Sequence, residues 1–310
     1  MSGYSVNGVD LDNIFILGNG ATATGYLLSD GSDLSSRYAV NTTGIYAPDT
    51  GYTTSLNGYA NKDLSQIFEP LLFTQTFGTV LYNNVINGVT YNYCVTYTDT
   101  SNPGTITFYK DVSLNIFLCG GGADGGGIKG LPAYGAGGGG GGGYIDQPGI
   151  SSTANTIWNI KVSVPSVSSI DYTSFYNSDI DISYNAYGGA HGGDTNNGAG
   201  GSVGYPQNNT YKPGVGDYKA GGGGAGSGGD GANGSSSGGG SGGQGYSFST
   251  TLYSNVYYGV GGNGGPANLY IDGTDATFYG NGGGGSSRLG RVVGGKGYQG
   301  IAIVYFNYPT

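Results

Sequence analysis

The chain has 310 residues and 69 of them are glycine, about 22 % where soluble proteins average about 7 %. Charged residues make up only 9 %. This composition excludes a long helical protein, because each interior glycine costs about 1 kcal/mol relative to alanine in a helix. It also excludes collagen, which needs glycine at every third position, and it disfavours a conventional enzyme.

The formal net charge of −9 comes from 19 acidic residues against 10 basic ones. An acidic chain with so few Lys and Arg is not expected to bind nucleic acid or anionic lipid. No apolar stretch approaches the roughly 18 residues of a membrane helix, so we expect no membrane insertion. Met1 is followed by neither a basic nor an apolar segment, which predicts synthesis in a cytoplasm without a secretory signal peptide.

Residues 1–70 are expected to form an extended N-terminal docking arm with an internal repeat. The pattern Asp-Leu-x-x-(Ile or Arg)-aromatic occurs at 10–15, 33–38 and 63–68. Asp is a good helix N-cap, and the Leu and the aromatic residue four positions later then share one side of a short helical turn. Such a turn is unstable alone and has to pack on another surface.

We therefore predict that the apolar residues of the three copies dock on a partner subunit; they are Leu11, Phe15, Leu34, Tyr38, Leu64 and Phe68. The alternative is a small local cap on the chain's own body.

Residues 71–310 are expected to form an all-β body, whose glycine-rich part covers 120–300. Dense Tyr and Thr at 91–97 and 105–109, and alternating apolar residues at 112–118 and 157–164, predict strands. The segment 301–306 is predicted as a buried closing strand, and 268–279 as a hairpin that turns at Asp272-Gly273. Cys94 and Cys119 lie in strand-like runs and are expected to be small buried hydrophobic residues.

The glycines are concentrated in the body, with 57 of them at positions 120–300. An ordered glycine run needs a gain that offsets its large loss of conformational entropy. Left-handed extended helices with three residues per turn have no internal hydrogen bonds, so several can pack closely and bond one another laterally. We predict such inserted, packed polyglycine II helices, with aromatic residues sealing their edge. The alternative is a flexible glycine-rich linker.

Three segments carry a resemblance to known families. The strand that enters a poly-Gly block between Phe108 and Gly143, and the closing strand before Phe306, are similar to the glycine-rich domain family of phage tail-fibre and adhesin proteins and of large DNA virus virion proteins. The segment 6–15 resembles repeats in virion proteins of large algal and amoebal DNA viruses. The resemblance implies a β-sandwich, jelly-roll-like, that carries packed polyglycine helices.

Few residues in the sequence indicate chemistry. The single histidine, His191, has no second His or nearby Cys, so neither a catalytic residue, a cofactor nor a metal site is predicted. Asp and Asn residues in glycine-rich turns, such as Asp194, Asp230 and Asn233, leave calcium binding open, with turn chemistry as the favoured interpretation. Candidate ligand-binding residues are the tyrosines of the glycine-poor loops, with a core or lid role as the alternative; they are Tyr205, Tyr211, Tyr218, Tyr253, Tyr257 and Tyr258.

These observations and the resemblance together favour a non-enzymatic virion structural protein. We expect a surface-associated minor capsid, spike or fibre component that is made in the host cytoplasm, binds capsid or other virion proteins, and has a host surface glycan or receptor as a candidate ligand. By analogy with β-rich viral fibres, a homotrimer is expected. The alternatives are a phage tail-tip receptor-binding adhesin and a silk-like wall structural protein.

Overall fold

The computed structural model divides the chain into two units, residues 1–74 and 75–310. Before residue 72 the structure describes only six short strands. From there on it describes 72–128, 135–165, 171–194, 198–207, 210–217, 219–236, 238–254, 256–267, 271–287 and 294–307. None of these described residues is α-helical, and the strands pair antiparallel, so the chain is all-β over this part.

The first unit contains three two-stranded pairs: β1 (Ser5–Val6) with β2 (Val9–Asp10), β3 (Ile16–Leu17) with β4 (Tyr26–Leu27), and β5 (Tyr38–Val40) with β6 (Phe68–Pro70). In the last pair, Val40 lies opposite Phe68 and Tyr38 opposite Pro70. Tyr38 and Phe68 were expected to end helical turns, and that expectation is wrong for these two residues. The backbone groups of this segment are paired between strands from two distant copies of the repeat, and not within a local helical turn.

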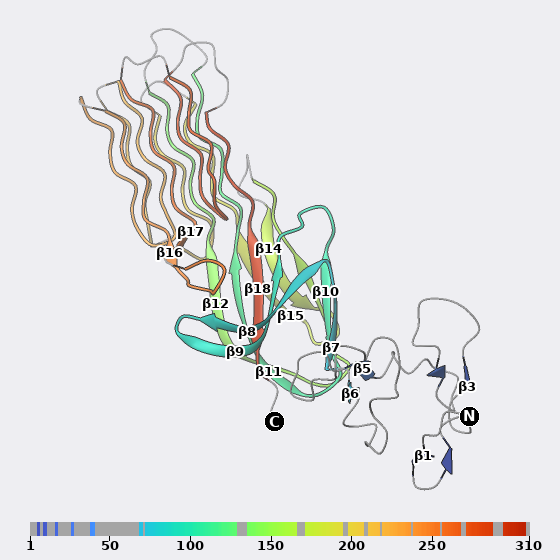
Figure 1. Cartoon of the computed structure of the whole chain (residues 1–310). Coiled ribbons are helices and arrows are strands. Elements are labelled where there is room, and N and C mark those ends of the chain that lie inside the picture. The colour runs from blue at the N-terminus through green and yellow to red at the C-terminus, as the bar shows by residue number, and fades with distance from the viewer. Residues whose placement is uncertain are drawn as a thin grey trace. The chain divides into compact units, whose positions relative to one another are not determined.

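Two five-stranded antiparallel sheets, of which only the start of β7 precedes residue 75, make up the core of the second unit (Figure 1). One has the order β15-β14-β13-β10-β7, with β7 at Phe73–Thr76, β10 at Gly104–Phe108, β13 at Ile157–Lys161, β14 at Tyr172–Asn177 and β15 at Ile182–Tyr187. The other has the order β12-β11-β18-β9-β8, with β8 at Gly78–Ile86, β9 at Val89–Tyr97, β11 at Val112–Cys119, β12 at Tyr144–Ser152 and β18 at Ile301–Phe306. A further short pair joins β16 (Tyr246–Ser247) to β17 (Tyr257–Tyr258).

The two five-stranded sheets are layered on each other through apolar faces. The rings of Phe108 and Phe306, one from each sheet, lie 5.1 Å apart at 86°. The only tryptophan, Trp158, is fully buried, stacks on Phe175 at 4.5 Å, and donates its indole N–H to the hydroxyl of Ser152 across the layers. Burial of aromatic and aliphatic side chains on facing strands supplies the main driving force for this layer.

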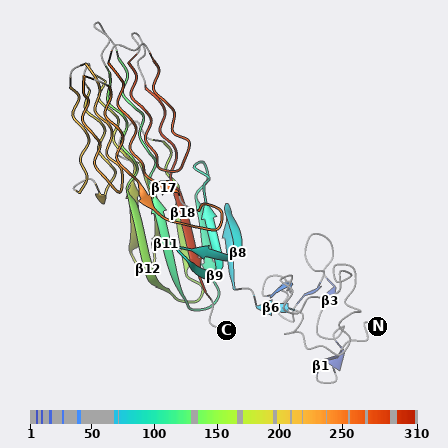
Figure 2. The same ribbon diagram turned by 60° about the vertical axis from the view of Figure 1, so that its left-hand side comes forward.

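The glycine-rich part of the second unit consists of extended segments that run side by side beyond one end of the sheets (Figure 2). None of their described residues is α-helical, and strand pairing within them is limited to the β16–β17 pair and to isolated bridges such as Gly226 with Gly229. Instead, backbone N–H groups of one segment donate to carbonyl oxygens of others that are far away in sequence. Most of these glycines are buried, so the interior of this region is main chain rather than side chain.

Residues 137–143 lie within this array, and all seven are buried. Their amides donate with a three-residue period: 137, 140 and 143 to segment 187–193, 138 and 141 to segment 222–225, and 139 and 142 to segment 280–283, at 2.8–3.1 Å. Their carbonyls accept from segments 120–126, 198–204 and 259–265 at 2.7–3.0 Å. One glycine run is therefore bonded to six other segments, which pair all seven of its buried amides and six of its carbonyls.

Asp and Asn side chains complete the pairing where a segment lacks a backbone partner. The Oδ1 atom of Asn281 accepts the N–H of Val260 at 2.9 Å, while the next amide, Gly282, donates to the carbonyl of the same valine at 2.8 Å. The same two-bond ring recurs three times, with Asp230 on Lys212, Asn233 on Val215 and Asp275 on Lys296. The side-chain oxygen takes the place of a backbone carbonyl, which is how Asx residues act in turns.

An aromatic cluster joins the glycine-rich array to the β12-β11-β18-β9-β8 sheet. Phe117 stacks on Phe248 with ring centroids 4.0 Å apart, and Tyr144 stacks on Tyr246 at 3.7 Å. The fully buried Tyr258 completes this cluster. The prediction that aromatic residues seal the array's edge is confirmed for these tyrosines.

Most of the predicted strands are confirmed, including both that flank the glycine-rich part, β11 and β18. Cys94 and Cys119 are buried free thiols, as expected. The predicted hairpin at 268–279 is wrong for residues 271–279, none of which forms a strand. Thr274 instead accepts the amide of Gly284 at 2.8 Å, which makes this stretch another segment of the array.

Candidate functional site

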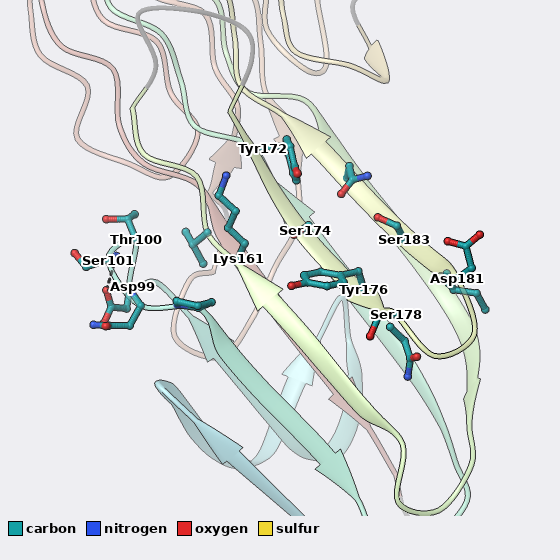
Figure 3. A pocket seen from close by; sticks show the side chains of 16 residues that line it. Asp99, Thr100, Ser101, Lys161, Tyr172, Ser174, Tyr176, Ser178, Asp181 and Ser183 are labelled. Atoms are coloured by element: carbon teal, nitrogen blue, oxygen red, sulfur yellow. Dashed lines mark hydrogen bonds between the residues drawn. The ribbon is translucent and has the colours of Figure 1, made fainter.

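A groove of about 690 Å³ lies on the outer face of the β15-β14-β13-β10-β7 sheet (Figure 3). Its lining residues come from β13, β14 and β15, from the residue after β13, and from the loops that join β9 to β10 and β14 to β15; they are Asp99, Thr100, Ser101, Asn102, Pro103, Lys161, Val162, Tyr172, Ser174, Tyr176, Asn177, Ser178, Asp181, Ile182, Ser183 and Asn185. Its volume lies within the range of about 300–1,000 Å³ that small-molecule sites occupy.

Strand register sets the floor of the groove in two rows. Lys161, Ser174 and Asn185 lie opposite one another on β13, β14 and β15. Tyr176 and Ser183 form the next row. Because side chains alternate along a strand, these residues share the outer face. Between them Phe175 points into the core, where it is fully buried.

Ser174 occupies a central place in the floor and is only 2 % exposed. Its hydroxyl has no hydrogen-bond partner among the residues that the structure describes. Buried hydroxyl groups are nearly always paired, because leaving one unpaired costs about 1–3 kcal/mol. The unused donor and acceptor of Ser174 therefore lie just beneath the floor of the groove, with its Oγ atom covered by neighbouring atoms.

Tyr176 supplies the aromatic surface of the groove. Its side chain is 38 % exposed, and no ring contact with another described residue occupies its face. Figure 3 shows its ring lying across the sheet, with the hydroxyl on the side of the loop that carries Asp99. The neighbouring Tyr172 is engaged, because the Lys161 ammonium lies 4.6 Å from its ring centroid.

The charged residues of the groove are largely satisfied within the protein. Lys161 forms an ion pair with Asp171, whose other carboxylate oxygen accepts the amide of Val164 at 2.9 Å. Hydrogen bonds from the side chain of Asn102 and from the amide of Ser101 hold the pKa of Asp99 below its ordinary value. Apart from the carboxylate of Asp181, the remaining polar surface is made of neutral hydroxyl and carboxamide groups, which favours an uncharged polar ligand over an anion.

Among the described residues, no group of three or more His, Cys, Asp and Glu side chains is placed to hold a metal ion. Asp230 and Asn233 direct an oxygen to backbone amides, which supports the turn interpretation of these residues. Within the described ranges no helix has the length and apolar character to cross a membrane.

The structure does not gather the described tyrosines of the predicted set into one site, and none of these five lines the groove. Tyr205 and Tyr257 are exposed at 53 % and 44 %, and Tyr211 is partly exposed. Tyr253 packs against the aromatic cluster, and Tyr258 is fully buried there, which removes Tyr258 from the predicted ligand-binding set. Of the predicted residues, Tyr218, Leu11, Phe15, Leu34 and Leu64 lie outside the described part of the chain.

Sequence reasoning missed the groove residues because they come from two glycine-poor segments, 99–103 and 161–185, that are far apart in the chain. The alternation of Tyr172, Ser174 and Tyr176 is the signal that marks a strand with a polar outer face. A scan against protein-family models found no match for the chain, and a search of curated proteins returned none either.

Proposed function

We propose that the glycine-rich part is a lattice of polyglycine II helices and that the protein is a non-enzymatic structural component built around this lattice. The supporting observation is the three-residue period with which residues 137–143 donate to three neighbouring segments. A left-handed helix with three residues per turn points successive amides in three directions around its axis. An α-helix or a strand would give periods of 3.6 or 2.

The packing explains why the sequence uses glycine. A Cβ atom added at any position from 137 to 143 would lie 1.8–2.3 Å from a backbone carbonyl oxygen of a neighbouring segment. Real Cβ atoms essentially never come within 3.0 Å of another heavy atom. Any other residue would push the segments apart and break their lateral hydrogen bonds. The lattice therefore depends on glycine sterically, and it forms a rigid module with a hydrogen-bonded interior.

A rigid, acidic, side-chain-poor module suits an exposed structural role. On this basis, and on the resemblance to virion and tail-fibre proteins, we assign the chain to the virion surface as a minor capsid, spike or fibre component. In this proposal residues 1–70 dock on capsid or other virion proteins, and the body, with jelly-roll-like connectivity and a trimeric assembly, projects outward. No catalytic residue takes part.

Deletion of residues 1–70 tests the placement of the protein. Purified virions should lack the truncated chain. The separately expressed body should keep the native emission of Trp158, which is buried between its two sheets. The measurement is quantitative mass spectrometry of purified particles with full-length and truncated chains. Unchanged incorporation of the truncated chain would contradict the docking role.

A further inference from the structure

We propose that the groove on the outer face of β13, β14 and β15 binds a neutral saccharide, with Tyr176 as the stacking platform and Ser174 as the central hydrogen-bonding group. The inference deepens the proposed function, because it gives a surface component a specific ligand class. It rests on the chemistry of the groove and not on the glycine-rich lattice, so either can fail without the other.

The first argument is the match between the lining and a sugar. A pyranose presents hydroxyl groups around its rim and a patch of C–H groups on one face. The groove offers hydroxyl and carboxamide side chains on adjacent strands, including Ser183 and Asn185, beside the accessible ring of Tyr176. Tyrosine buries a large apolar face at low conformational-entropy cost and keeps its hydroxyl available, which suits a ligand of this mixed character.

The second argument is the unpaired hydroxyl of Ser174. A group that is 2 % exposed and has no partner in the described protein is unfavourable until it receives one. A ligand hydroxyl can both donate to it and accept from it. The unpaired hydroxyl is thus evidence for a ligand that is independent of the shape of the groove.

The third argument is charge. The positive charge of Lys161 is matched by Asp171, and two further carboxylates, Asp99 and Asp181, line the groove. The local field is therefore negative and disfavours sulfated, phosphorylated or sialylated ligands. A neutral sugar avoids that repulsion, and its affinity is expected to depend little on ionic strength.

The test uses the full chain and a panel of methyl glycosides of glucose, galactose, mannose and N-acetylglucosamine, with a methyl sialoside as the charged comparison. Saturation-transfer NMR detects binding, and titration gives dissociation constants. We expect at least one neutral glycoside to bind more tightly than the sialoside. Between low and high salt its affinity should change by less than about twofold, since no net charge is neutralised.

Variants assign the binding to the groove. Tyr176→Ala should weaken it by about tenfold, as removal of a central aromatic contact does, whereas Tyr176→Phe should stay close to the wild type. Ser174→Ala should weaken binding by about fivefold, the scale of one lost hydrogen bond. Tyr82→Ala is the matched control, because it removes an exposed tyrosine that does not line the groove and is not among the candidate ligand-binding residues. If Ser174→Ala alters the near-ultraviolet circular dichroism, Asn185→Ala takes its place.

Several results would overturn the proposal: no neutral glycoside binds, the sialoside binds best, or Tyr176→Ala binds as the wild type does. Hydrogen exchange in segment 137–143 of the same samples separates this failure from failure of the lattice. Loss of sugar binding with slow exchange there leaves the structural role standing and rejects only the groove.

Discussion

Gly140→Ala is the sharpest perturbation of the glycine lattice. The Cβ atom of an alanine at this position would lie 2.0 Å from the carbonyl oxygen of Ser202, where ordinary contact begins at 3.4 Å. Segment 198–204 would have to move away by about 1.4 Å, the difference between these two distances. The atom in the way is backbone, so no side-chain rotation can relieve the clash.

That displacement would stretch the three hydrogen bonds that join segment 198–204 to segment 135–143. In these bonds the amides of Gly198, Gly201 and Gly204 donate to the carbonyls of Gly135, Gly138 and Gly141, at 3.3, 2.8 and 3.0 Å. A buried group that loses its partner costs about 1–3 kcal/mol. Alanine also lowers the conformational entropy of the unfolded chain, which stabilises the folded protein by about 0.4–1 kcal/mol. Loss of two of the three bonds therefore predicts a net destabilisation of about 1–6 kcal/mol.

Gly238→Ala is the matched control, because a Cβ atom there meets nothing within 4 Å and the residue has no positive φ. We expect it to leave stability unchanged or to raise it by about 0.4–1 kcal/mol. The assay is guanidinium unfolding, followed by the far-ultraviolet signal and by the emission of Trp158. A Gly140→Ala protein within about 0.5 kcal/mol of the wild type would refute close packing of backbone against backbone.

Three further predictions concern the lattice edge, the thiols and alkaline pH. Asn281→Ala should lower the free energy of unfolding by about 1 kcal/mol because the Val260 amide loses its acceptor, while Asn281→Asp, which keeps the oxygen, should lower it less; equal losses in denaturant melts would contradict this. Burial raises the pKa of Cys94 to about 11 and also raises the pKa of Cys119. Neither thiol should therefore react with Ellman's reagent at pH 8 until the protein is unfolded. Rapid labelling of the native chain would disprove their burial. Burial, and then the charge of Asp146, raise the pKa of Tyr246 to about 12 from an unfolded value near 10. The neutral phenol of Tyr246 therefore contributes fully to stability below pH 10, and this contribution is lost as the pH rises toward 12. A denaturation midpoint that stays constant between pH 10 and 12 would contradict this prediction.

The sequence allowed the strands of the sheets to be predicted where side chains alternate, as in β11, whose Val112, Leu114 and Ile116 all face the core. The hairpin predicted around Asp272-Gly273 was wrong because local turn chemistry competes there with lateral bonds from distant segments. Gly284 and Gly295, which determine the backbone path near Thr274, are not its neighbours in sequence.

The groove could not be predicted for a related reason. Its floor depends on the register that sets Ser174 opposite both Lys161 and Asn185, and its wall comes from a loop about seventy residues earlier in the chain. Register follows from pairing, which a single sequence does not reveal. The tyrosines predicted from glycine-poor loops lie partly on the surface and partly in the core. The consecutive residues Tyr257, which is exposed, and Tyr258, which is buried, are an example.

Hydrogen–deuterium exchange on the intact protein tests the lattice most directly. The amides of residues 137–143 are buried and bonded to three different segments, so they should exchange as slowly as those of the core strands β11 and β18. Exchange of these seven amides at the rate of an unstructured glycine chain, while the core strands stay protected, would contradict the lattice and the structural role derived from it.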